Sequence, residues 1–560
     1  MPKTTYELER EANIARNRAL IEQLQLKSAS ASITEKAKVP AKPKQQQKPK
    51  IKPVQPIKKE KRAVQEAPRR ASARLRGSTS AVDPDETPAQ KRKREREDED
   101  RRRKEEEERL AAEERAREAK RPRHHELDLE TLAEQEESEP LSGLSSTFQS
   151  LLLARHPRRR GERDAFVFES RKKEDAEVAA LRARVQNLKI VARAKVTQDR
   201  VYSAAYHPEP TKDLIFFGDK HGQLGLWDAR APAEEVGEED DVDLDQKEAG
   251  KYWRLQVHWP ATAQSSISCI KFDPIDAHSV YTSAYDSSVR SLSFTSGISR
   301  EVFAMEKVLL TSMDLPPASH EMWLSDAEGW ITHLDLREHK SKFRTYQVSD
   351  QKVGCVSVNP TNPTFILTAS NNRSLKVWDV RKLQKIPAHD GVFELDRGGV
   401  DEFKASKGGA ATLRAEWKHD KSVTSAYWDP RGRSIVSTSY DDALRIWDLR
   451  PSLMATDVPF PNFKPVTRIR HNCQTGKWLT MLKAQWSPNP DVYPHFTIGD
   501  LDHSLDIFGC KGEFLAKLSD KDKVSATQAV TCSHPSVVER VASGNGSGRC
   551  VLWAPADLVE

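Results

Sequence analysis

The sequence predicts an all-β fold in which seven strand-rich units close into a ring after a long charged arm. Three observations predict it. Related phrases that end on Trp-Asp occur at 216–230, 366–381 and 435–450. A proline follows the first apolar strand of most units, as HP, DP, NP, DP, SP and HP. All twelve Trp lie after residue 187. Repetition at this spacing indicates a repeat architecture confined to the later part of the chain.

The phrase at 435–450 has the residue types of one blade of a WD-repeat β-propeller. Ser439, Asp441 and Trp447, with His419 upstream, have the spacing of a hydrogen-bond relay within such a blade. We therefore expect a seven-bladed propeller over 187–560, with six or eight blades as the alternatives. The alternating stretch 187–196 can supply the fourth strand of the last blade, which closes the ring and removes exposed sheet edges.

The part before the ring has a different composition. Residues 1–187 hold 45 Lys and Arg against 35 Asp and Glu, and only four aromatic residues. Such a chain buries too little apolar surface to offset its ordering entropy. We expect a short amphipathic helix at 1–26 and a disordered charged arm at 27–186. Ile14, Ile21 and Leu24 share one side of that helix, which is either solvated or docks in a partner's groove.

Basic clusters at 69–77, 91–97 and 101–104 have the composition of nuclear-import signals. They predict a nuclear protein, and a cytoplasmic pool is compatible with them. Residues 27–76 hold 16 basic residues against 3 acidic ones, which favours contact with phosphate backbones. A solubilising tail is the alternative.

Two insertions interrupt the repeats: an acidic loop at 232–248 with nine acidic residues, and a loop insertion at 383–417. The six Cys form no CxxC pair, which argues against a disulfide framework and fits a reducing compartment. No apolar run approaches the roughly 20 residues that a membrane span needs, so we expect no membrane association.

Nothing in the sequence predicts catalysis. The Ser, His and Asp residues recur once per unit, whereas a nucleophile is needed only once, so we interpret them as structural. The glycine-rich run 543–550 lacks the Lys-Ser/Thr of a phosphate loop. No cluster has metal-ligand spacing. We expect a protein that is not an enzyme and has no catalytic residue, cofactor or metal.

The segment 468–486 is the strongest candidate for binding. It places Arg468, Arg470, His471, Asn472, Lys477 and Trp478 around a turn at 474–476. Cations interleaved with an aromatic ring suit a nucleic acid, because charge holds phosphates and the ring stacks on or wedges between bases. The alternative is that Trp478 belongs to the core and the cations are merely solvated.

HNCQTGKWLT at 471–480, with GDKHGQLGLWD, SAYDSSVRSL, VTCSHP and the N-terminal helix, resembles the changed-mutation-rate family of fungal DNA-damage-binding WD-repeat proteins. That family is similar to the small WD-repeat subunit of the damaged-DNA-binding heterodimer. The resemblance implies that a hairpin at 470–478 probes the minor groove and that Arg200, Lys220 and Lys352 contact phosphates. The relative's inserted hairpin residues are not reproduced here, so the resemblance supports general DNA binding more directly than lesion recognition.

The endings that carry Arg230, Arg381 and Arg450 resemble the box of cullin-ligase substrate receptors. Two hypotheses follow. The first is a nuclear, monomeric propeller that binds double-stranded DNA and prefers damaged or distorted duplex. The second is a protein-interaction scaffold whose partners are histones, other chromatin proteins or a cullin-ligase adaptor.

Overall fold

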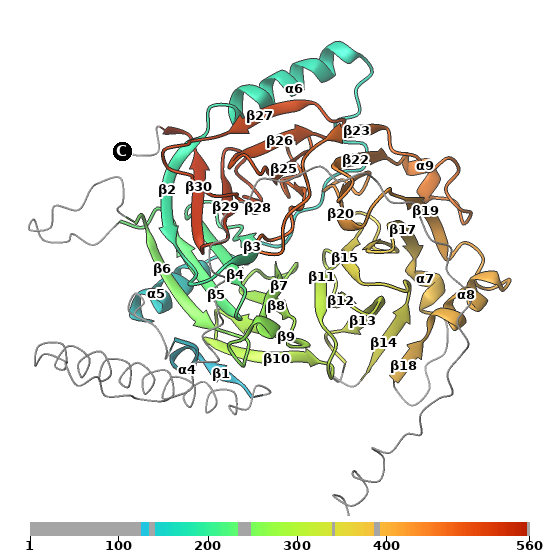
Figure 1. Ribbon diagram of the computed structural model, residues 1–560, viewed down its shortest axis with the longest axis horizontal. Coiled ribbons are helices and arrows are strands. Elements are labelled where there is room, and N and C mark those ends of the chain that lie inside the picture. The colour runs from blue at the N-terminus through green and yellow to red at the C-terminus, as the bar shows by residue number, and fades with distance from the viewer. Residues whose placement is uncertain (1–124, 134–140, 233–247, 339–341, 386–391, 557–560) are drawn as a thin grey trace, which may run out of the picture. The chain divides into compact units, whose positions relative to one another are not determined.

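The computed structural model describes residues 125–133, 141–232, 248–338, 342–385 and 392–556. Seven sheets, antiparallel except for the pair of β14 (Phe343–Gln347) with β18 (Val392–Leu395), are arranged as blades around a central channel (Figure 1). The seven-bladed propeller predicted from the sequence is therefore confirmed. The first strand of each blade lies innermost and contacts the first strand of the next blade. No helix in the described ranges is long and apolar enough to cross a membrane.

The four main strands of each blade follow in chain order except at the ring closure, where β2 (Lys189–Lys195) joins blade 7, and two further strands, β1 (Leu127–Asp128) and β18, add to the edges of blades 2 and 3. Blade 1 is β3 (Val201–Tyr206), β4 (Leu214–Asp219), β5 (Gln223–Asp228) and β6 (Lys251–Gln256). Blade 2 is β7 (Ile267–Phe272), β8 (Ser279–Ala284), β9 (Ser288–Ser293) and β10 (Ile298–Ala304), with β1 (Leu127–Asp128) at its edge. Blade 3 is β11 (Leu310–Asp314), β12 (Glu321–Asp326), β13 (Trp330–Asp335) and β14 (Phe343–Gln347), with β18 (Val392–Leu395) at its edge.

The remaining blades follow the same plan. Blade 4 is β15 (Val353–Val358), β16 (Phe365–Ser370), β17 (Ser374–Asp379) and β19 (Leu413–Lys418). Blade 5 is β20 (Val423–Trp428), β21 (Ser434–Ser439), β22 (Ala443–Asp448) and β23 (Thr467–Arg470). Blade 6 is β24 (Gln485–Trp486), β25 (His495–Gly499), β26 (Leu505–Gly509) and β27 (Phe514–Leu518). Blade 7 is β28 (Val530–Ser533), β29 (Val541–Gly544), β30 (Arg549–Ala554) and β2 (Lys189–Lys195).

The ring closes between β2 and β30, which pair antiparallel from Lys189–Ala554 to Lys195–Arg549. Each blade packs between two others, so strands such as β4, β5, β15 and β16 are buried along their whole length. Burial on both faces is why β4 and β16 begin with the uninterrupted apolar runs LIFF and FIL rather than with an alternating pattern. Trp residues on the third strands, Trp227, Trp378, Trp447 and Trp553, fill the space between blades.

The expectation of a disordered arm extending to residue 186 is wrong for 125–133 and 141–186. Here the chain forms α4 (Leu129–Ala133), α5 (Leu141–Leu151) and α6 (Arg171–Val185). In α5, Phe148 stacks on Phe294 of blade 2 with ring centroids 4.5 Å apart. In α6, Val178, Leu181 and Val185 are buried in the same core cluster as blades 6 and 7. The expectations for 1–26 and for the arm up to residue 124 lie outside the described residues.

Residues 154–168, which we call the strap segment, cross one end of the ring. Arg158 N donates to Pro274 O of blade 2 at 2.8 Å, and Gly161 N donates to Pro430 O of blade 5 at 3.2 Å. Arginine side chains of the strap donate to backbone carbonyls of blades 3 and 4. The order of this segment comes from these contacts with distant turns and from Phe166 and Phe168, whose rings pack on Tyr493.

The insertion at 383–417 is not simply a loop. It contains β18, which pairs parallel with β14, helix α8 (Arg397–Ala405) and most of β19. Asp396 caps α8 by accepting a hydrogen bond from Gly399 N at 2.9 Å. A loop was expected because the glycines at 398–399 and 408–409 suggest turns, but the first pair lies inside the helix. Short helices α7 (Val380–Leu383) and α9 (Pro451–Met454) follow the third strands of blades 4 and 5. Most of the acidic insertion lies outside the described residues.

Candidate nucleic-acid interface

The two ends of the ring carry different loops. The strap segment covers one end. The other end, which we call the loop face, holds the loops that lead into each first strand and the turns between second and third strands. It includes 196–200, 219–222, 284–288, 348–352, 440–442 and 471–484. Arg200 and Lys352 directly precede β3 and β15, and Lys220 lies in the β4–β5 turn, so antiparallel topology places all three at the loop face.

The expected hairpin at 470–478 is not a β-hairpin. Residues 471–484 form no strand, and the chain reverses through turns in which Thr475 N donates to Cys473 O and Leu479 N donates to Gly476 O, both at 3.1 Å. Trp478 is 74% exposed, so it does not belong to the core. Its indole lies against Gly476, where an added Cβ would be 2.9 Å from Trp478 Cε2. The absence of a side chain at 476 thus lets the ring lie close to the backbone.

Arg200 connects this segment to blade 1. Its Nη1 donates to the carbonyl of Lys477 at 3.2 Å, and its guanidinium lies 6.0 Å from the ring centroid of Tyr202. Thr480 Oγ1 donates to the carbonyl of Val201, the first residue of β3. The segment, which leads into blade 6, is therefore also attached to blade 1, on the far side of blade 7.

Lys352 is a half-buried cation at the channel mouth. Its Nζ donates to Tyr285 Oη at 3.3 Å and lies 5.3 Å from the centroid of that ring. No carboxylate pairs with it among the described residues, and burial lowers the pKa of Lys352. An ammonium that has lost water without gaining a counter-charge is suited to an anion from outside the chain.

A cavity of about 270 Å³ lies at this mouth. Its charged lining residues are all lysines, and its aromatic ones are all tyrosines: Lys352, Lys477, Lys483, Tyr202, Tyr285 and Tyr440. No carboxylate from the described part of the chain lines it. The cavity is adjacent to the channel, because Tyr202, Lys483 and Met481 line both.

The other residues predicted to bind DNA do not all lie at this mouth. Arg468 and Arg470 are exposed on β23, the outermost strand of blade 5, and so lie on the outer rim. His471 is buried, Asn472 is exposed, and Lys220 is half-buried in its turn. The structure thus brings together Arg200, Lys352, Lys477 and Trp478 and separates them from the two rim arginines.

Sequence reasoning missed the three tyrosines and Lys483. Tyr285 and Tyr440 each directly precede the aspartate of the second turn, in the phrases AYD and SYD, so comparison of the repeats could have found them. Lys483 lies in a stretch that matches no other repeat, and nothing in its neighbours marks it.

The repeated His, Ser and Asp residues hold the blades together. In blade 2, His258 contacts Asp286 at 3.0 Å and Thr282 at 2.9 Å. In blade 5, His419 contacts Ser437 at 3.0 Å. The expectation that Ser439 occupies this position is wrong, because Ser439 instead donates to the carbonyls of Lys421 and Ser422. Burial lowers the pKa of His419 to about 4, so the ring is neutral at physiological pH.

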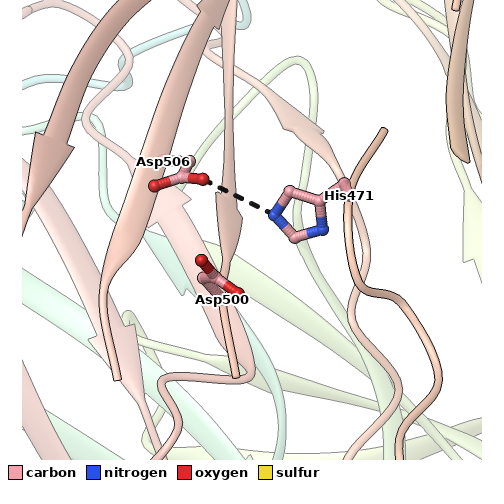
Figure 2. A group of neighbouring side chains, drawn as sticks. All are labelled: His471, Asp500 and Asp506. Atoms are coloured by element: carbon pink, nitrogen blue, oxygen red, sulfur yellow. Dashed lines mark ion pairs between the residues drawn. The ribbon is translucent and has the colours of Figure 1, made fainter. Parts of the chain in front are cut away.

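One group of potential metal ligands was not expected from the sequence. His471, Asp500 and Asp506 face one another in blade 6, with His471 Nε2 3.7 Å from Asp506 Oδ2 (Figure 2). Burial lowers the pKa of His471 and raises the pKa of Asp506 to about 6. His471 lies in a loop, whereas Asp500 and Asp506 lie in a turn and a strand roughly 30 positions later, so no short sequence motif contains all three.

The candidate partner-binding arginines follow third strands. Arg230 pairs with Asp213, and Arg381 pairs with Asp379 at 2.6 Å and Asp457 at 3.0 Å. Arg450 is exposed before α9. Two of the three are thus held by carboxylates of the chain itself. Ile14, Ile21 and Leu24 lie outside the described residues.

Fold and repeats together define a WD-repeat propeller with a cavity at the loop face that lysines and tyrosines line. The family "WD domain, G-beta repeat" matches residues 340–379 and 412–448. The protein named DNA damage-binding protein CMR1 from Cryptococcus neoformans var. neoformans serotype D (strain JEC21) is 36% identical over 618 residues, covering 100% of both chains. The protein of that name from Mycosarcoma maydis is 32% identical, covering 98% of this chain and 99% of its own. The chain therefore belongs to the CMR1 family of WD-repeat proteins.

Another relative of that name, from Phaeosphaeria nodorum, is 30% identical and covers 98% of each chain. Family membership confirms the resemblance drawn from the segment 471–480. Among solved structures, Chaetomium thermophilum Raptor gives a TM-score of 0.46 at 13% identity, covering 69% of this chain and 30% of its own. That similarity is too low to bear on function.

Proposed function

We propose that this protein binds double-stranded DNA at the loop face and prefers damaged or distorted duplex. Phosphates lie against Arg200, Lys220, Lys352 and Lys477, and Trp478 tests the stacking of the bases. The proposal has support from the name of the relatives, DNA damage-binding protein, and from the chemistry of the channel mouth.

The observation that carries the proposal is the lining of the mouth, to which the described residues contribute three lysines, three tyrosines and no carboxylate. The whole chain is close to neutral, with 90 basic and 84 acidic residues, so this local excess of cations is not a consequence of composition. A concave surface with one sign of charge attracts a polyanion. Lysine and arginine contacts to phosphates provide affinity without reading sequence.

The preference for damage rests on Trp478 and its support. A planar, exposed ring can wedge between bases only if the energy of unstacking is recovered. A lesion or distortion lowers that energy, because the base stack is already weakened. Arg200 and Thr480 hold both sides of the turn, so the ring is presented by a segment that is fixed at two points.

The test uses the full chain and a short fluorescent duplex, with and without an abasic site, in anisotropy titrations at about 50 and 200 mM salt. We expect affinity to fall with salt for both duplexes and to be higher for the abasic one. Lys477→Glu should weaken binding to both. Arg468→Glu, an equal charge reversal on the outer rim, is the matched control and should have a much smaller effect. Equal losses for the two variants, or binding that does not depend on salt, would contradict the proposal.

We also propose a nuclear location, which the basic clusters before residue 105 support. Alanine substitution of the arginines and lysines at 91–97 and 101–104 in a fluorescently tagged full chain should move it to the cytoplasm. Retention in the nucleus would contradict this.

A further inference from the structure

His471, Asp500 and Asp506 meet beneath the loop face. His471 is the first residue of the segment 471–484, Asp500 follows β25, and Asp506 lies within β26. Their nearest ligand atoms all lie within 4.8 Å of one another, and Figure 2 shows the imidazole and both carboxylates directed into the same space. The side chains of His471 and Asp506 are 4% and 10% exposed.

The spacing does not fit a hydrogen bond. His471 Nε2 and Asp506 Oδ2 are 3.7 Å apart, which is longer than an N–H···O bond. Neither His471 Nε2 nor Asp506 Oδ1 has a hydrogen-bond partner among the described residues. Buried polar atoms are almost always satisfied, and leaving one unsatisfied is costly. The unsatisfied His471 Nε2 faces the other oxygen of Asp506, Oδ2, across a space that no hydrogen bond spans.

Other blades show what this position usually does. In blades 2 and 5 a hydroxyl group on the second strand forms a hydrogen bond with the histidine: Thr282 with His258, and Ser437 with His419. Each is paired across the ladder with an arginine: Thr282 with Arg290, and Ser437 with Arg445. The pair at this position in blade 6 is Ile498 with Asp506. The hydroxyl is replaced by an apolar side chain and the arginine by a carboxylate. The hydrogen-bond relay is therefore absent from blade 6, and an imidazole with two carboxylates occupies the equivalent position.

We propose that His471, Asp500 and Asp506 bind a divalent transition-metal cation of the zinc class. One imidazole nitrogen with two carboxylates is a donor set that suits zinc, whereas magnesium and calcium prefer oxygen alone. Donors about 2.1 Å from a tetrahedral ion lie about 3.4 Å from each other. The ligand atoms of His471 and Asp506 are 3.7 Å apart and all three lie within 4.8 Å of one another, so the side chains must move closer together to bind the ion. A fourth position remains for water.

Two neighbours shape the site. Cys473 Sγ lies 3.6 Å from His471 Nδ1, so it contacts the nitrogen that is not directed at Asp506 and helps to orient the ring. Lys517 Nζ donates to Asp500 Oδ2 at 3.0 Å and competes with a cation for that carboxylate. Its side chain is 42% exposed and can move into solvent. Removal of the Lys517 charge should therefore strengthen metal binding at this site. If zinc instead bound unspecifically to scattered carboxylates or thiols, substitution of this one lysine would have no effect on its affinity.

The bound ion would tie the start of the segment 471–484 to the second and third strands of blade 6. The far side of the segment is already attached to blade 1 through Arg200. Metal binding does not depend on DNA, so this inference stands or fails separately from the proposed function.

The experiment uses the full chain, freed of metal by a chelator and titrated with Zn²⁺, and separately with Mg²⁺, by calorimetry. We expect one zinc site and much weaker binding of magnesium. Loss of a residue that only supports a metal ligand lowers affinity roughly 10–100-fold. His471→Asn and Asp506→Asn each remove a ligand and should lower zinc affinity by at least that factor. Lys517→Gln should raise it.

The matched control is His503→Asn. His503 is exposed in the β25–β26 turn and has φ 63°, a conformation that Asn tolerates, so this variant should bind zinc as the unmodified chain does. Cys473→Ser should retain most of the affinity. Thermal unfolding gives a second readout: zinc should raise the Tm of the unmodified chain and of His503→Asn, but not of Asp506→Asn. Zinc binding that persists unchanged in both ligand variants, or that is lost only in Cys473→Ser, would overturn the proposal.

Discussion

The guanidinium of Arg200 donates a hydrogen bond to the backbone carbonyl of Lys477, 277 residues further along the chain, at 3.2 Å. This contact joins the loop before β3 to the segment 471–484 across the loop face. A cation that could contact a phosphate thus also holds the segment that carries Trp478. The two roles can be separated by substitution.

Arg200→Lys keeps the charge but loses the planar group that reaches the carbonyl. We expect the segment 473–480 to exchange its amide hydrogens faster, while affinity for intact duplex changes little. Arg200→Ala should show the faster exchange and also a lower affinity. Hydrogen exchange followed by mass spectrometry measures the first effect, and anisotropy the second. Unchanged exchange in both variants would show that the contact does not hold the segment.

Lys352→Met should bind DNA more weakly without destabilising the protein. The ammonium is half-buried and has no carboxylate partner within the described ranges, so its replacement by an apolar group of similar length removes a desolvation cost. We expect Tm to be unchanged or higher. The slope of log affinity against log salt should become shallower by about 0.9, the value for one phosphate contact. A lower Tm with an unchanged slope would mean that Lys352 is structural.

Trp478→Ala should remove the preference for damaged duplex and leave the fold intact. The ring is 74% exposed, so the free energy of unfolding should change by no more than about 0.5 kcal/mol. Stacking of a base on an aromatic ring contributes about 1–3 kcal/mol, so affinity for the abasic duplex should fall roughly 5–150-fold. Val466→Ala, at another exposed apolar residue, is the control and should change neither quantity.

Gly161→Ala tests the strap segment. An added Cβ would be 2.9 Å from the carbonyl oxygen of Pro430, a backbone atom that cannot move aside. We expect a loss of roughly 1–3 kcal/mol in the free energy of unfolding, measured in urea. Gly408→Ala is the matched control, because the nearest atom to its added Cβ is Ser406 Oγ at 3.9 Å. Equal stability of the two variants would mean that the strap does not contribute to folding.

His419→Asn tests the relay in blade 5 through its pH dependence. Burial lowers the pKa of His419 to about 4, below the 6.5 of an exposed histidine. Between those values the unfolded chain binds the proton and the folded chain does not, so this histidine's contribution is complete above pH 6.5 and is lost as pH falls toward 4. The variant should therefore be less stable than the unmodified chain at pH 7, and the difference should shrink toward pH 4. Urea unfolding at several pH values measures it.

The ring could be predicted because its determinants are local and repeated. Each of these determinants reflects the structure of a single blade: the prolines after first strands, the Trp-Asp endings and the alternation at 187–196. The pairing of β2 with β30 agrees with the prediction from that alternation. The strap segment could not be predicted, because its arginines resemble those of a solvated linker. Their partners are carbonyls of turns in several blades, such as Leu315 O, which accepts from Arg158 Nη1 at 3.0 Å.

The candidate site divides in the same way. Arg200, Lys220 and Lys352 were placed correctly at one end of the ring, because strand order alone determines which loops share that end. The separation of Arg468 and Arg470 from the mouth could not be inferred, since it depends on β23 being an outermost strand. The cluster around His471 was missed because it arises from a departure from the repeat in blade 6 and not from any pattern within it.

The antiparallel seam between β2 and β30 has a mechanical consequence. Lys189 pairs with Ala554, so the outer ends of the two strands lie side by side. A pull that separated those ends would peel the hydrogen bonds apart one after another, which needs far less force than shearing them together. Tension arriving from before residue 154, however, must first dislodge the strap segment, which contacts blades 2 to 5, and α6, which packs on the core of blades 6 and 7. The seam that closes the ring is thus shielded from load by the segment that precedes it.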